Sequence, residues 1–454
     1  MIRLQQYKGK SVHFIGIGGC SMSGLAVILK DLGYFPKGSD INESVFTAKL
    51  AKTQIPYVIG HSEENIGDAA LVVYSAAIHP GNPEYDAAKR RGLPMLERSE
   101  LLGLISRQYE TVVGIAGCHG KTTITSMCAL ILRECGVNLT VHIGGMVDFL
   151  GGGVQVGDYP AFLTEACEYV RSFLQLAPTH TLINNIDDDH LDCYKDIDEI
   201  YAAFKEYAAL LPLSGMLFAN VHDPLVMRLA SESGRETVTF GFENADYTAV
   251  DEKYDALGCP EFTVYTPKGT AAAKLGVVGR HNMANALAAI AVCCEVFGVS
   301  PKDAARALAD YHLVGRRFEM MGEKNGIKVI HDYAHHPSEI AACLEAASRY
   351  PHKKLWAVFQ CNSYTRAKTL KDKYATCFGY ADAVIVPDIY PGRDIDRGEI
   401  HARDLVAAIG RYATCVYIPT FEEISDYLDK HAAPGDVVVT LGSGSVGKET
   451  SKLL

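Results

Sequence analysis

The sequence predicts an α/β protein with three domains, each built around its own sheet. At 454 residues the chain is too long for one core, because domains average about 150 residues. Short apolar runs of strand length alternate with amphipathic helical stretches, which is the pattern of βα units. Glycine-rich turns follow two of these runs and precede helices. We therefore expect domains over residues 1–107, 108–313 and 314–454.

Composition and charge exclude several classes of protein. A net charge of −11 without an Arg-rich patch argues against a nucleic-acid surface. The 13 cysteines include no C-x-x-C pair and are too sparse for a disulfide scaffold, which indicates reduced thiols. The start "MIRLQQYKGK" lacks the apolar core of a signal peptide, and no window resembles a membrane span. We expect a cytoplasmic protein, monomeric or weakly dimeric, without nucleic-acid or membrane partners.

The first domain opens with "SVHFIGIGGCSMSGLAVILKDLG", residues 11–33, where an apolar strand enters glycines and then a helix. This predicts a Rossmann-like unit, although Ser21 stands where the third glycine of G-x-G-x-x-G belongs. Asp40 ends the next expected strand, where a ribose-binding acid lies in dinucleotide folds. An NAD site is one interpretation, and a tight turn that only lets strand and helix pack is another. A further strand is expected at 70–78, followed by a helix within 79–94.

The second glycine-rich turn, "GIAGCHGKTTITSM" at residues 114–127, has the chemistry of a phosphate site. Backbone N–H groups at a helix N-terminus favour anions, Lys121 adds a charge, and the Thr122 hydroxyl can bind magnesium. The match is G-x-x-G-K-T, because Ile115 stands where the full P-loop pattern has glycine. An accidental Gly-Lys-Thr is the alternative. Strand, turn and helix in this order predict nucleoside triphosphate binding, in a P-loop ATPase-like central domain with a mostly parallel sheet and helices.

Further polar groups follow expected strands of the central domain, at 161–166 and 181–186. Glu165 ends the first, where open α/β sheets present groups to ligands. His190 follows the second among four acids, which are Asp187, Asp188, Asp189 and Asp192. Magnesium prefers oxygen ligands, so Glu165 and Thr122 are natural partners and His190 is a less usual one. The alternative for the His190 cluster is a solvated polar turn. An amphipathic helix is expected over 196–211.

The helix expected from Gly279 carries His281, Asn282 and Asn285 in its first turns. Residues three apart share a helix face. Composition alone favours a role in capping and packing the helix. Alternatively, the amide groups line the nucleotide site.

The third domain gathers polar groups around one strand, at 328–331, ahead of further strands at 355–359, 383–386, 415–418 and 437–440. Adjacent Arg316 and Arg317 can bind carboxylate or phosphate, or can simply be exposed. The segment "DYAHHP", residues 332–337, places a His pair after the strand and before a helix begun by Pro337. We expect both histidines at an open mouth of the sheet.

Taken together, these motifs resemble those of the Mur ligase family. They occur in order along nearly the whole chain: "HFIGIGGCSMSGLA", "GSD", "GCHGKTT", "EACE", "NIDDDHLD", "GRHNMANALAA", "RRFE", "DYAHHP", "SYTR" and "DIYPGRD". The resemblance implies a Rossmann-like first domain for a UDP-sugar, a central ATPase and a Rossmann-like α/β domain for an amino acid. It implies ATP-dependent ligation of L-alanine to UDP-N-acetylmuramate through an acyl phosphate, with Mg²⁺, in peptidoglycan synthesis. Closure of the domains would exclude water from that intermediate.

The resemblance also implies roles for individual residues. Catalysis would involve Lys121, Glu165, His190, Arg317 and His335. ATP would contact Gly117, Cys118, His119, Gly120, Lys121, Thr122, Thr123, His281, Asn282, Asn285, Arg317 and Asp332. Thr122, Glu165 and His190 would bind the metal. The UDP-sugar and amino acid would contact Gly18, Gly19, Ser21, Met22, Asp40, Ser75, Tyr333, His335 and Arg366.

Three departures from the family pattern leave alternatives open. Cys118 replaces a threonine in the phosphate loop, one small residue for another. Cys361 and Asn362 replace a proline and a histidine, and Ser445 replaces an acid. Because the last two changes fall in the third domain, a related ligase with another amino acid or acceptor is the main alternative. A dehydrogenase would leave Lys121 and Glu165 without a role, and a non-enzymatic nucleotide-binding protein would not need the polar third domain.

Overall fold

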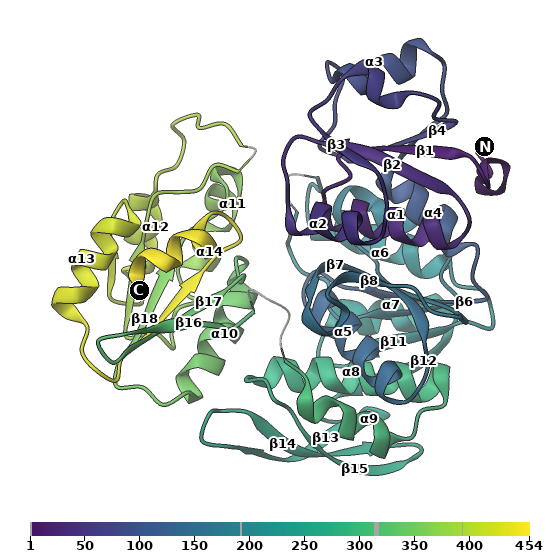
Figure 1. Cartoon of the computed structure of the whole chain (residues 1–454). Helices are drawn as coiled ribbons and strands as arrows, with labels where there is room; N and C mark the ends of the chain where they lie inside the picture. Colours follow the sequence, from purple (N-terminus) through teal and green to yellow (C-terminus); the bar gives the residue numbers. More distant parts are fainter. Residues whose placement is uncertain (1, 191–192, 313–316, 393) are drawn as a thin grey trace. The chain divides into compact units, whose positions relative to one another are not determined.

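The computed structural model describes residues 2–190, 193–312, 317–392 and 394–454 (Figure 1). The chain divides into two compact units, which are described separately below. The first comprises Met1–Asp187, Ile197–Tyr247 and Ala288–Ala304, and the second comprises Asp188–Asp196, Thr248–Leu287 and Ala305–Leu454. The predicted boundary at 313–314 lies outside the described residues, as do Asp192 and Arg316.

The first unit begins with a five-stranded parallel sheet in the order β3-β2-β1-β4-β5. Its strands are β1 (Ser11–Ile15), β2 (Phe35–Asp40), β3 (Tyr57–Ile59), β4 (Leu71–Tyr74) and β5 (Met95–Glu97). The connecting helices are α1 (Cys20–Asp31), α2 (Val45–Lys52), α3 (Pro83–Arg90) and α4 (Arg98–Ser106). Strand order reverses between β1 and β4, so this is the predicted Rossmann-like domain, and its ligand edge lies beyond the carboxyl ends of these two strands.

Seven neighbouring strands of a second sheet lie in the first unit, in the order β12-β11-β10-β6-β9-β7-β8. Its neighbours pair in parallel, except that β7 and β8 are antiparallel. The strands are β6 (Thr111–Ala116), β7 (Leu139–Val147), β8 (Gly152–Gln155), β9 (Tyr159–Glu165), β10 (His180–Ile183), β11 (Met216–Asn220) and β12 (Glu236–Gly241). The helices are α5 (Lys121–Glu134), α6 (Ile197–Ala209) and α7 (Pro224–Ser233). This confirms the mostly parallel central sheet that the sequence predicts.

The two sheets of the first unit meet through α1, which packs against β7 and β8. Gly24 of α1 faces these strands, and a Cβ there would make ordinary van der Waals contacts, 3.4 Å from Val154 and 3.5 Å from the His142 ring. The glycine-rich helix of the first domain therefore lies directly on a strand that neighbours β9.

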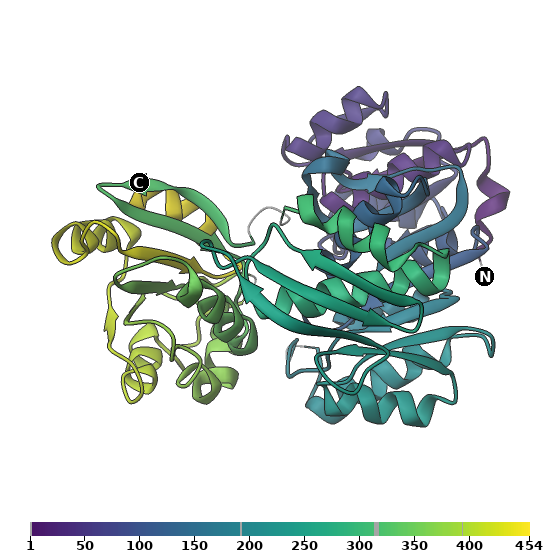
Figure 2. The same cartoon turned by 90° about the horizontal axis from the view of Figure 1, so that it is seen from below.

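The second unit contains an antiparallel ribbon and a six-stranded sheet. The ribbon strands are β13 (Tyr247–Tyr254), β14 (Pro260–Thr266) and β15 (Gly269–Lys274), which Figure 2 shows from below. The sheet runs β16-β17-β21-β18-β19-β20, and only β16 is antiparallel to its neighbour. Its strands are β16 (Glu319–Lys324), β17 (Ile327–Asp332), β18 (Leu355–Phe359), β19 (Ala383–Val386), β20 (Cys415–Tyr417) and β21 (Val437–Leu441).

Helices cover both faces of the six-stranded sheet, since buried side chains form one cluster on each face. They are α10 (Pro337–Arg349), α11 (Tyr364–Tyr374), α12 (Ala402–Ile409), α13 (Phe421–His431) and α14 (Val446–Glu449). Helix α8 (Arg280–Phe297) begins in the second unit and ends in the first. Helix α9 (Pro301–Ala307) begins in the first unit and ends in the second. With its parallel strands, this sheet agrees with the predicted Rossmann-like third domain, so the α/β fold class is confirmed.

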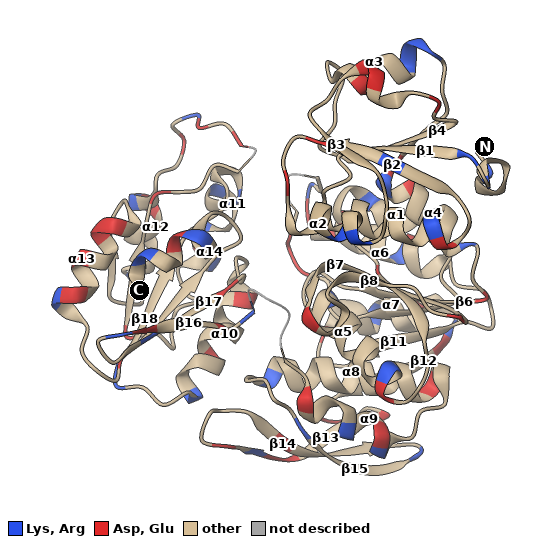
Figure 3. Ribbon diagram, viewed as in Figure 1, with Lys and Arg blue, Asp and Glu red and all other residues tan. Residues whose placement is uncertain are grey.

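The structure describes the surface charges, the thiols and the helix lengths. Lys and Arg are interspersed with Asp and Glu over the elements seen in Figure 3. All thirteen cysteines are free thiols. Among the described residues, no helix is both long and apolar enough to cross a membrane.

Candidate active site

The phosphate loop lies between β6 and α5 and has the backbone of an anion site. Gly117 and Gly120 have φ values of +131° and +85°, which side-chain-bearing residues rarely adopt. A Cβ on Gly117 would come within 3.1 Å of the backbone nitrogens of Asn184 and Asn185. In the described part of the chain no side chain caps α5, so its first N–H groups stay open to a ligand. The loop therefore fits a phosphate.

Lys121, the first residue of α5, is held inside this loop. Its Nζ donates to the carbonyl oxygens of Gly117 at 2.6 Å and Cys118 at 3.1 Å, and to both carboxylate oxygens of Glu168 at 2.9 Å. The side chains of Lys121 and Glu168 are 13% and 1% exposed. Burial alone would lower the pKa of Lys121, but the Glu168 carboxylate outweighs it, so the pKa lies above its usual value. The ammonium stays charged at every physiological pH.

Two asparagines after β10 fix the loop from the other side. Asn185 accepts from the His119 N–H at 2.7 Å, and the side-chain amides of Asn184 and Asn185 both donate to the His119 carbonyl at 3.1 Å. Cys118, the substituted loop residue, is buried with its Sγ 3.2 Å from the Asp187 nitrogen. The Cys118 sulfur therefore accepts a hydrogen bond that a small polar side chain at this position would also accept.

Glu165 lies at the same edge of the sheet as the phosphate loop. It ends β9, and its register partner is Ile115 of β6, one residue before the end of that strand. Its Oε1 accepts from the Gly144 N–H at 3.0 Å. Thr122 is partly exposed in the first turn of α5. A carboxylate and a hydroxyl are oxygen donors of the kind that magnesium prefers, so this donor set fits the metal.

The glycine turn after β1 forms the ligand edge of the first domain. Asp40 accepts from the Gly18 N–H at 2.8 Å, and a Cβ on Gly18 would lie 2.9 Å from the same carboxylate. Ser75 lies after β4, and a Cβ added to Gly16 would be 3.6 Å from the Ser75 Cβ. Gly19 precedes α1 as its N-cap, and Met22 is buried in its first turn. Asp40 thus supports the turn itself, in agreement with the tight-turn interpretation.

Ser21, the residue in place of the third glycine, bonds across to the second sheet. Its Oγ lies 2.9 Å from Nε2 of His142 on β7 and 3.5 Å from a guanidinium nitrogen of Arg98. Neither His142 nor Arg98 is marked by a sequence motif. The sequence signal for these contacts was the Ser21 hydroxyl, which stands in a glycine turn where any small side chain would fit.

In the second unit, several predicted residues meet at the carboxyl end of β17. Asp332 accepts from the N–H groups of Phe318 and Ala334, each at 2.7 Å, and burial raises its pKa. The Arg317 guanidinium lies 5.2 Å from the centre of the Tyr333 ring. Nδ1 of His335 lies 3.2 Å from a Glu339 oxygen, yet burial lowers the His335 pKa to about 4. The imidazole is therefore neutral at pH 7.

Two further predicted residues of the second unit share one acid. Arg366 of α11 donates to Oδ1 of Asp189 at 3.2 Å, and Nε2 of His190 lies 3.7 Å from Oδ2 of Asp189. Asp189 is 4% exposed. The solvated-turn interpretation of the His190 cluster is wrong for this acid, which is buried between the Arg366 guanidinium and the His190 ring.

The first turn of α8 holds the remaining predicted residues. Asn282 and Asn285 are buried, and Asn282 donates to the Val278 carbonyl at 2.8 Å while accepting from Asn285 at 3.1 Å. His281 is exposed. The two amides brace the start of the helix, as the capping interpretation requires, and their contact with nucleotide stays a prediction.

One expectation about the third domain is wrong. His336 does not lie at an open mouth but is fully buried, because it caps α10, with Nδ1 3.4 Å from the Ser338 nitrogen. His335 is the half-buried member of the pair. Among residues that the sequence did not single out, Glu168, Asn185, Arg98 and His142 contact predicted site residues.

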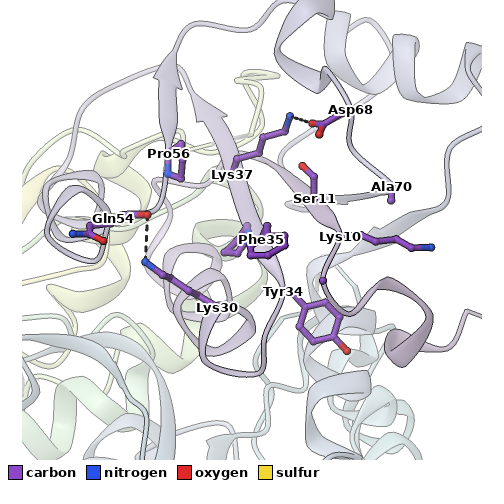
Figure 4. Close-up of a pocket in the computed structure, with 12 residues that line it drawn as sticks. Lys10, Ser11, Lys30, Tyr34, Phe35, Lys37, Gln54, Pro56, Asp68 and Ala70 are labelled. Carbon is purple, nitrogen blue, oxygen red and sulfur yellow. Dashed lines mark hydrogen bonds and ion pairs between the residues drawn. The ribbon is translucent and has the colours of Figure 1, made fainter.

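A cavity of about 680 Å³ lies away from these groups, at the amino ends of β1 and β2 (Figure 4). Lys10, Lys30 and Lys37 line it, with Lys37 paired to Asp68 at 2.7 Å. Ser11 and Phe35, which begin the two strands, place it at the edge opposite to the glycine turn. It is therefore separate from the ligand edge of the first domain.

A Rossmann-like sheet, a phosphate-loop sheet with an acid at its edge, and a third α/β sheet define the class of three-domain ATP-dependent ligases. Sequence models of this class match three consecutive parts of the chain: the catalytic domain of the Mur ligase family at residues 11–110, the Mur ligase middle domain at 115–293, and the Mur ligase glutamate ligase domain at 316–444. The chain belongs to the Mur ligase family.

Two curated relatives of the chain share one name. The chain is 45% identical, over 98% of its length and 96% of theirs, to the UDP-N-acetylmuramate--L-alanine ligase of Acetivibrio thermocellus. It is 42% identical, with the same coverage, to the enzyme of that name from Alkaliphilus metalliredigens. The crystal structure of UDP-N-acetylmuramate-alanine ligase from Thermotoga maritima superimposes with a TM-score of 0.78 at 28% identity, covering 98% of both chains.

Proposed function

We propose that this protein ligates L-alanine to the carboxyl group of UDP-N-acetylmuramate with hydrolysis of ATP to ADP and phosphate, a step of peptidoglycan synthesis. The observation that carries the proposal is the phosphate loop with Lys121 and Glu165 at one sheet edge, in a chain 45% identical to ligases of this name. Because ATP and UDP-sugars are cytoplasmic metabolites, the proposal includes a cytoplasmic location. We also propose that the protein is a monomer or a weak homodimer.

The three proposed domains divide the substrates among them. Residues 1–107 would bind the UDP-sugar, with its pyrophosphate at the glycine turn formed by Gly18, Gly19, Ser21 and Met22 and flanked by Asp40 and Ser75. Residues 108–313 would bind ATP, and residues 314–454 would bind the amino acid. Backbone N–H groups and the start of α1 favour a pyrophosphate at this turn.

The phosphate loop would bind ATP through Gly117 to Thr123. In this proposal Lys121 turns its ammonium toward the β- and γ-phosphates and stabilises charge in phosphoryl transfer. Thr122 and Glu165 would hold one magnesium ion, and His190 would approach a second. Bound magnesium supplies positive charge that neutralises the phosphate oxygens. His281, Asn282, Asn285, Arg317 and Asp332 would contact the nucleotide.

The reaction must activate a carboxylate, which is a poor acyl donor because its oxygen is a poor leaving group. A carboxylate oxygen of UDP-N-acetylmuramate attacks the γ-phosphorus of ATP, giving an acyl phosphate and ADP. The neutral amine of L-alanine then attacks the acyl carbon, loses a proton, and expels phosphate with that same oxygen. His335, which is neutral at pH 7, and Arg366 and Tyr333 would orient the sugar carboxylate and the amino acid.

Replacing Glu165 with Gln should weaken the magnesium site without disturbing the loop. We expect the magnesium concentration for half-maximal activity to rise at least about tenfold, as is usual when metal-site partners are lost. The measurement is a magnesium titration of phosphate release at saturating ATP. Glu134→Gln is the matched control, because Glu134 is exposed at the far end of α5. Equal titration curves for wild type and the Glu165 variant would remove Glu165 from the metal site.

The choice of amino acid needs its own test, because Cys361, Asn362 and Ser445 differ from the family pattern. In the structure Cys361 is buried, Asn362 donates to Ser443 at 3.1 Å, and Ser445 donates to Gln360 at 3.2 Å. Purified protein with ATP, magnesium and UDP-N-acetylmuramate is offered L-alanine, L-serine or glycine, and phosphate release is measured. We expect L-alanine to give the highest kcat/KM. No release with any of the three would favour the alternative of another amino acid or acceptor.

A further inference from the structure

A continuous chain of hydrogen bonds joins the glycine turn of the first domain to the strand that carries Glu165. Ser21 Oγ lies 2.9 Å from Nε2 of His142, and Nδ1 of His142 lies 3.2 Å from Oγ1 of Thr164. Thr164 directly precedes Glu165 and donates to its carbonyl oxygen at 3.1 Å. All four residues belong to the first compact unit. The turn and the acid are thus linked through one imidazole.

The surroundings of His142 make these contacts specific. His142 is 3% exposed and Thr164 is fully buried, so water does not compete for the bond between these two residues. Burial, together with the nearby Arg98 cation, lowers the pKa of His142 to about 3, so the ring is neutral. A neutral imidazole has one donor and one acceptor nitrogen, so a change in the bond at one nitrogen alters the bond at the other.

Strand β7 places His142 so that it reaches both sides. His142 is the register partner of Thr164 on β9, while Gly144, two residues further along β7, donates its N–H to Glu165 at 3.0 Å. A shift of β7 relative to β9 would therefore move the His142 contact and the Glu165 contact together. On its other side, the His142 ring faces Gly24 of α1, where a Cβ would lie 3.5 Å from the ring.

We propose that His142 is a positioning residue that couples occupation of the UDP-sugar site at Ser21 to the placement of Glu165 beside ATP. This inference rests on the proposed function and deepens it. A pyrophosphate that binds the Ser21 hydroxyl changes the bond to His142, and through Thr164 and β7 it favours one position of the Glu165 carboxylate. Each ligand should then raise the affinity of the other, because coupling between two sites is reciprocal.

The test is a binding cycle rather than an activity assay. Isothermal titration calorimetry gives the affinity for UDP-N-acetylmuramate with and without saturating magnesium and a nonhydrolysable ATP analogue. We expect at least a fivefold gain in the wild type, the lower end of usual coupling. His142→Phe, which keeps an aromatic ring but removes both nitrogens, should bring the gain below twofold.

Smaller changes separate the two halves of the chain. Thr164→Val removes one hydroxyl at constant shape, so it should abolish the coupling and leave UDP-N-acetylmuramate affinity without the analogue within twofold of wild type. In His142→Gln the side-chain amide reaches the place of Nε2, so it should keep the bond to Ser21 and the wild-type affinity for UDP-N-acetylmuramate, but not the coupling. If His142 had only a structural role, each variant would lose coupling in proportion to its loss of folding stability. The coupling and the affinity for UDP-N-acetylmuramate would then change together.

The outcomes also distinguish the inference from the proposed function. If wild type fails to bind UDP-N-acetylmuramate, the proposed function itself is wrong. If wild type binds it but shows no coupling, or if Thr164→Val and His142→Phe keep the full coupling, the role of His142 is overturned. Should His142→Phe not fold, Thr164→Val alone decides between these results.

Discussion

Replacing Lys121 with Met should reduce ATP-dependent phosphate release about a thousandfold, the upper range for loss of one preorganised charge or donor at a transition state. The methionine side chain keeps the length but removes the ammonium, while the loop backbone and its glycines stay in place. Because the glycine turn that we propose for the pyrophosphate belongs to another sheet of the same unit, UDP-N-acetylmuramate should bind with wild-type affinity. Turnover above a tenth of wild type would contradict the role of Lys121.

The ion pair between Lys121 and Glu168 makes a second variant necessary. Removing one partner of a buried pair costs about 3–5 kcal/mol, and the Glu168 side chain is 1% exposed. Lys121→Met alone could therefore lose activity by unfolding. The double variant Lys121→Met with Glu168→Gln removes both charges, so it should be more stable than the single variant and equally inactive.

The matched control is Lys302→Met, since Lys302 is exposed near the start of α9. It should keep wild-type turnover. The measurements are phosphate release, near-ultraviolet circular dichroism for folding, and calorimetric binding of UDP-N-acetylmuramate. A folded double variant with substantial turnover would show that the ammonium is not needed.

Replacing Glu84 with Gln should destabilise the first domain by about 3 kcal/mol, the upper cost of leaving a buried hydrogen-bonding group unsatisfied. Glu84 on α3 is fully buried, and its carboxylate lies 2.8 Å from Nε2 of His13 and accepts from Ser39 and Asn65, each at 2.6 Å. A glutamine has only one acceptor oxygen, and its amide nitrogen would face one of these donors.

Hydrogen exchange of the β1 and β2 amides measures this change locally, which matters because a multidomain chain need not unfold in one step. An energy of about 3 kcal/mol corresponds to exchange about a hundredfold faster. Glu63→Gln is the control, because Glu63 is 54% exposed and forms a surface ion pair with Arg90, of a kind worth about 0–1 kcal/mol. Equal protection in wild type and the Glu84 variant would contradict the network.

The same network predicts how stability depends on pH. Burial alone would raise the pKa of Glu84, but hydrogen bonds from His13, Ser39 and Asn65 outweigh it and lower the pKa to about 2. Since the unfolded chain has the ordinary, higher pKa, the carboxylate stabilises the fold fully above pH 4.5 and loses this effect as the pH falls toward 2. The stability difference between wild type and Glu84→Gln should thus be constant from pH 7 to about 5.5 and shrink below pH 4.5.

Buried parallel strands are the part of the fold that the sequence predicts best. The ranges expected at 355–359 and 383–386 coincide with β18 and β19, because both are uninterrupted apolar runs that are buried in full. The strands β13 to β15 were not predicted. They alternate exposed and buried residues, and charged side chains such as Asp251 and Glu252 interrupt the apolar pattern.

The candidate site divides in the same way. Lys121 and Glu165 can be found from sequence because each follows an apolar strand, and parallel strands end at one edge. Glu168 and His142 cannot, since their partners lie 47 and 121 residues away along the chain. The position of His336 was predicted wrongly. His336 caps α10, and this contact depends on the path of the backbone at Pro337, which the sequence pattern does not give.

Transfer of an oxygen atom tests the central claim most directly, namely that ATP activates the sugar carboxylate before the amine attacks. UDP-N-acetylmuramate labelled with ¹⁸O in its carboxyl group is incubated with ATP, magnesium, L-alanine and the protein, and the phosphate released is analysed by mass spectrometry. An acyl phosphate requires each phosphate to carry one oxygen from the carboxyl group. Unlabelled phosphate, released together with the ligated product, would contradict the account.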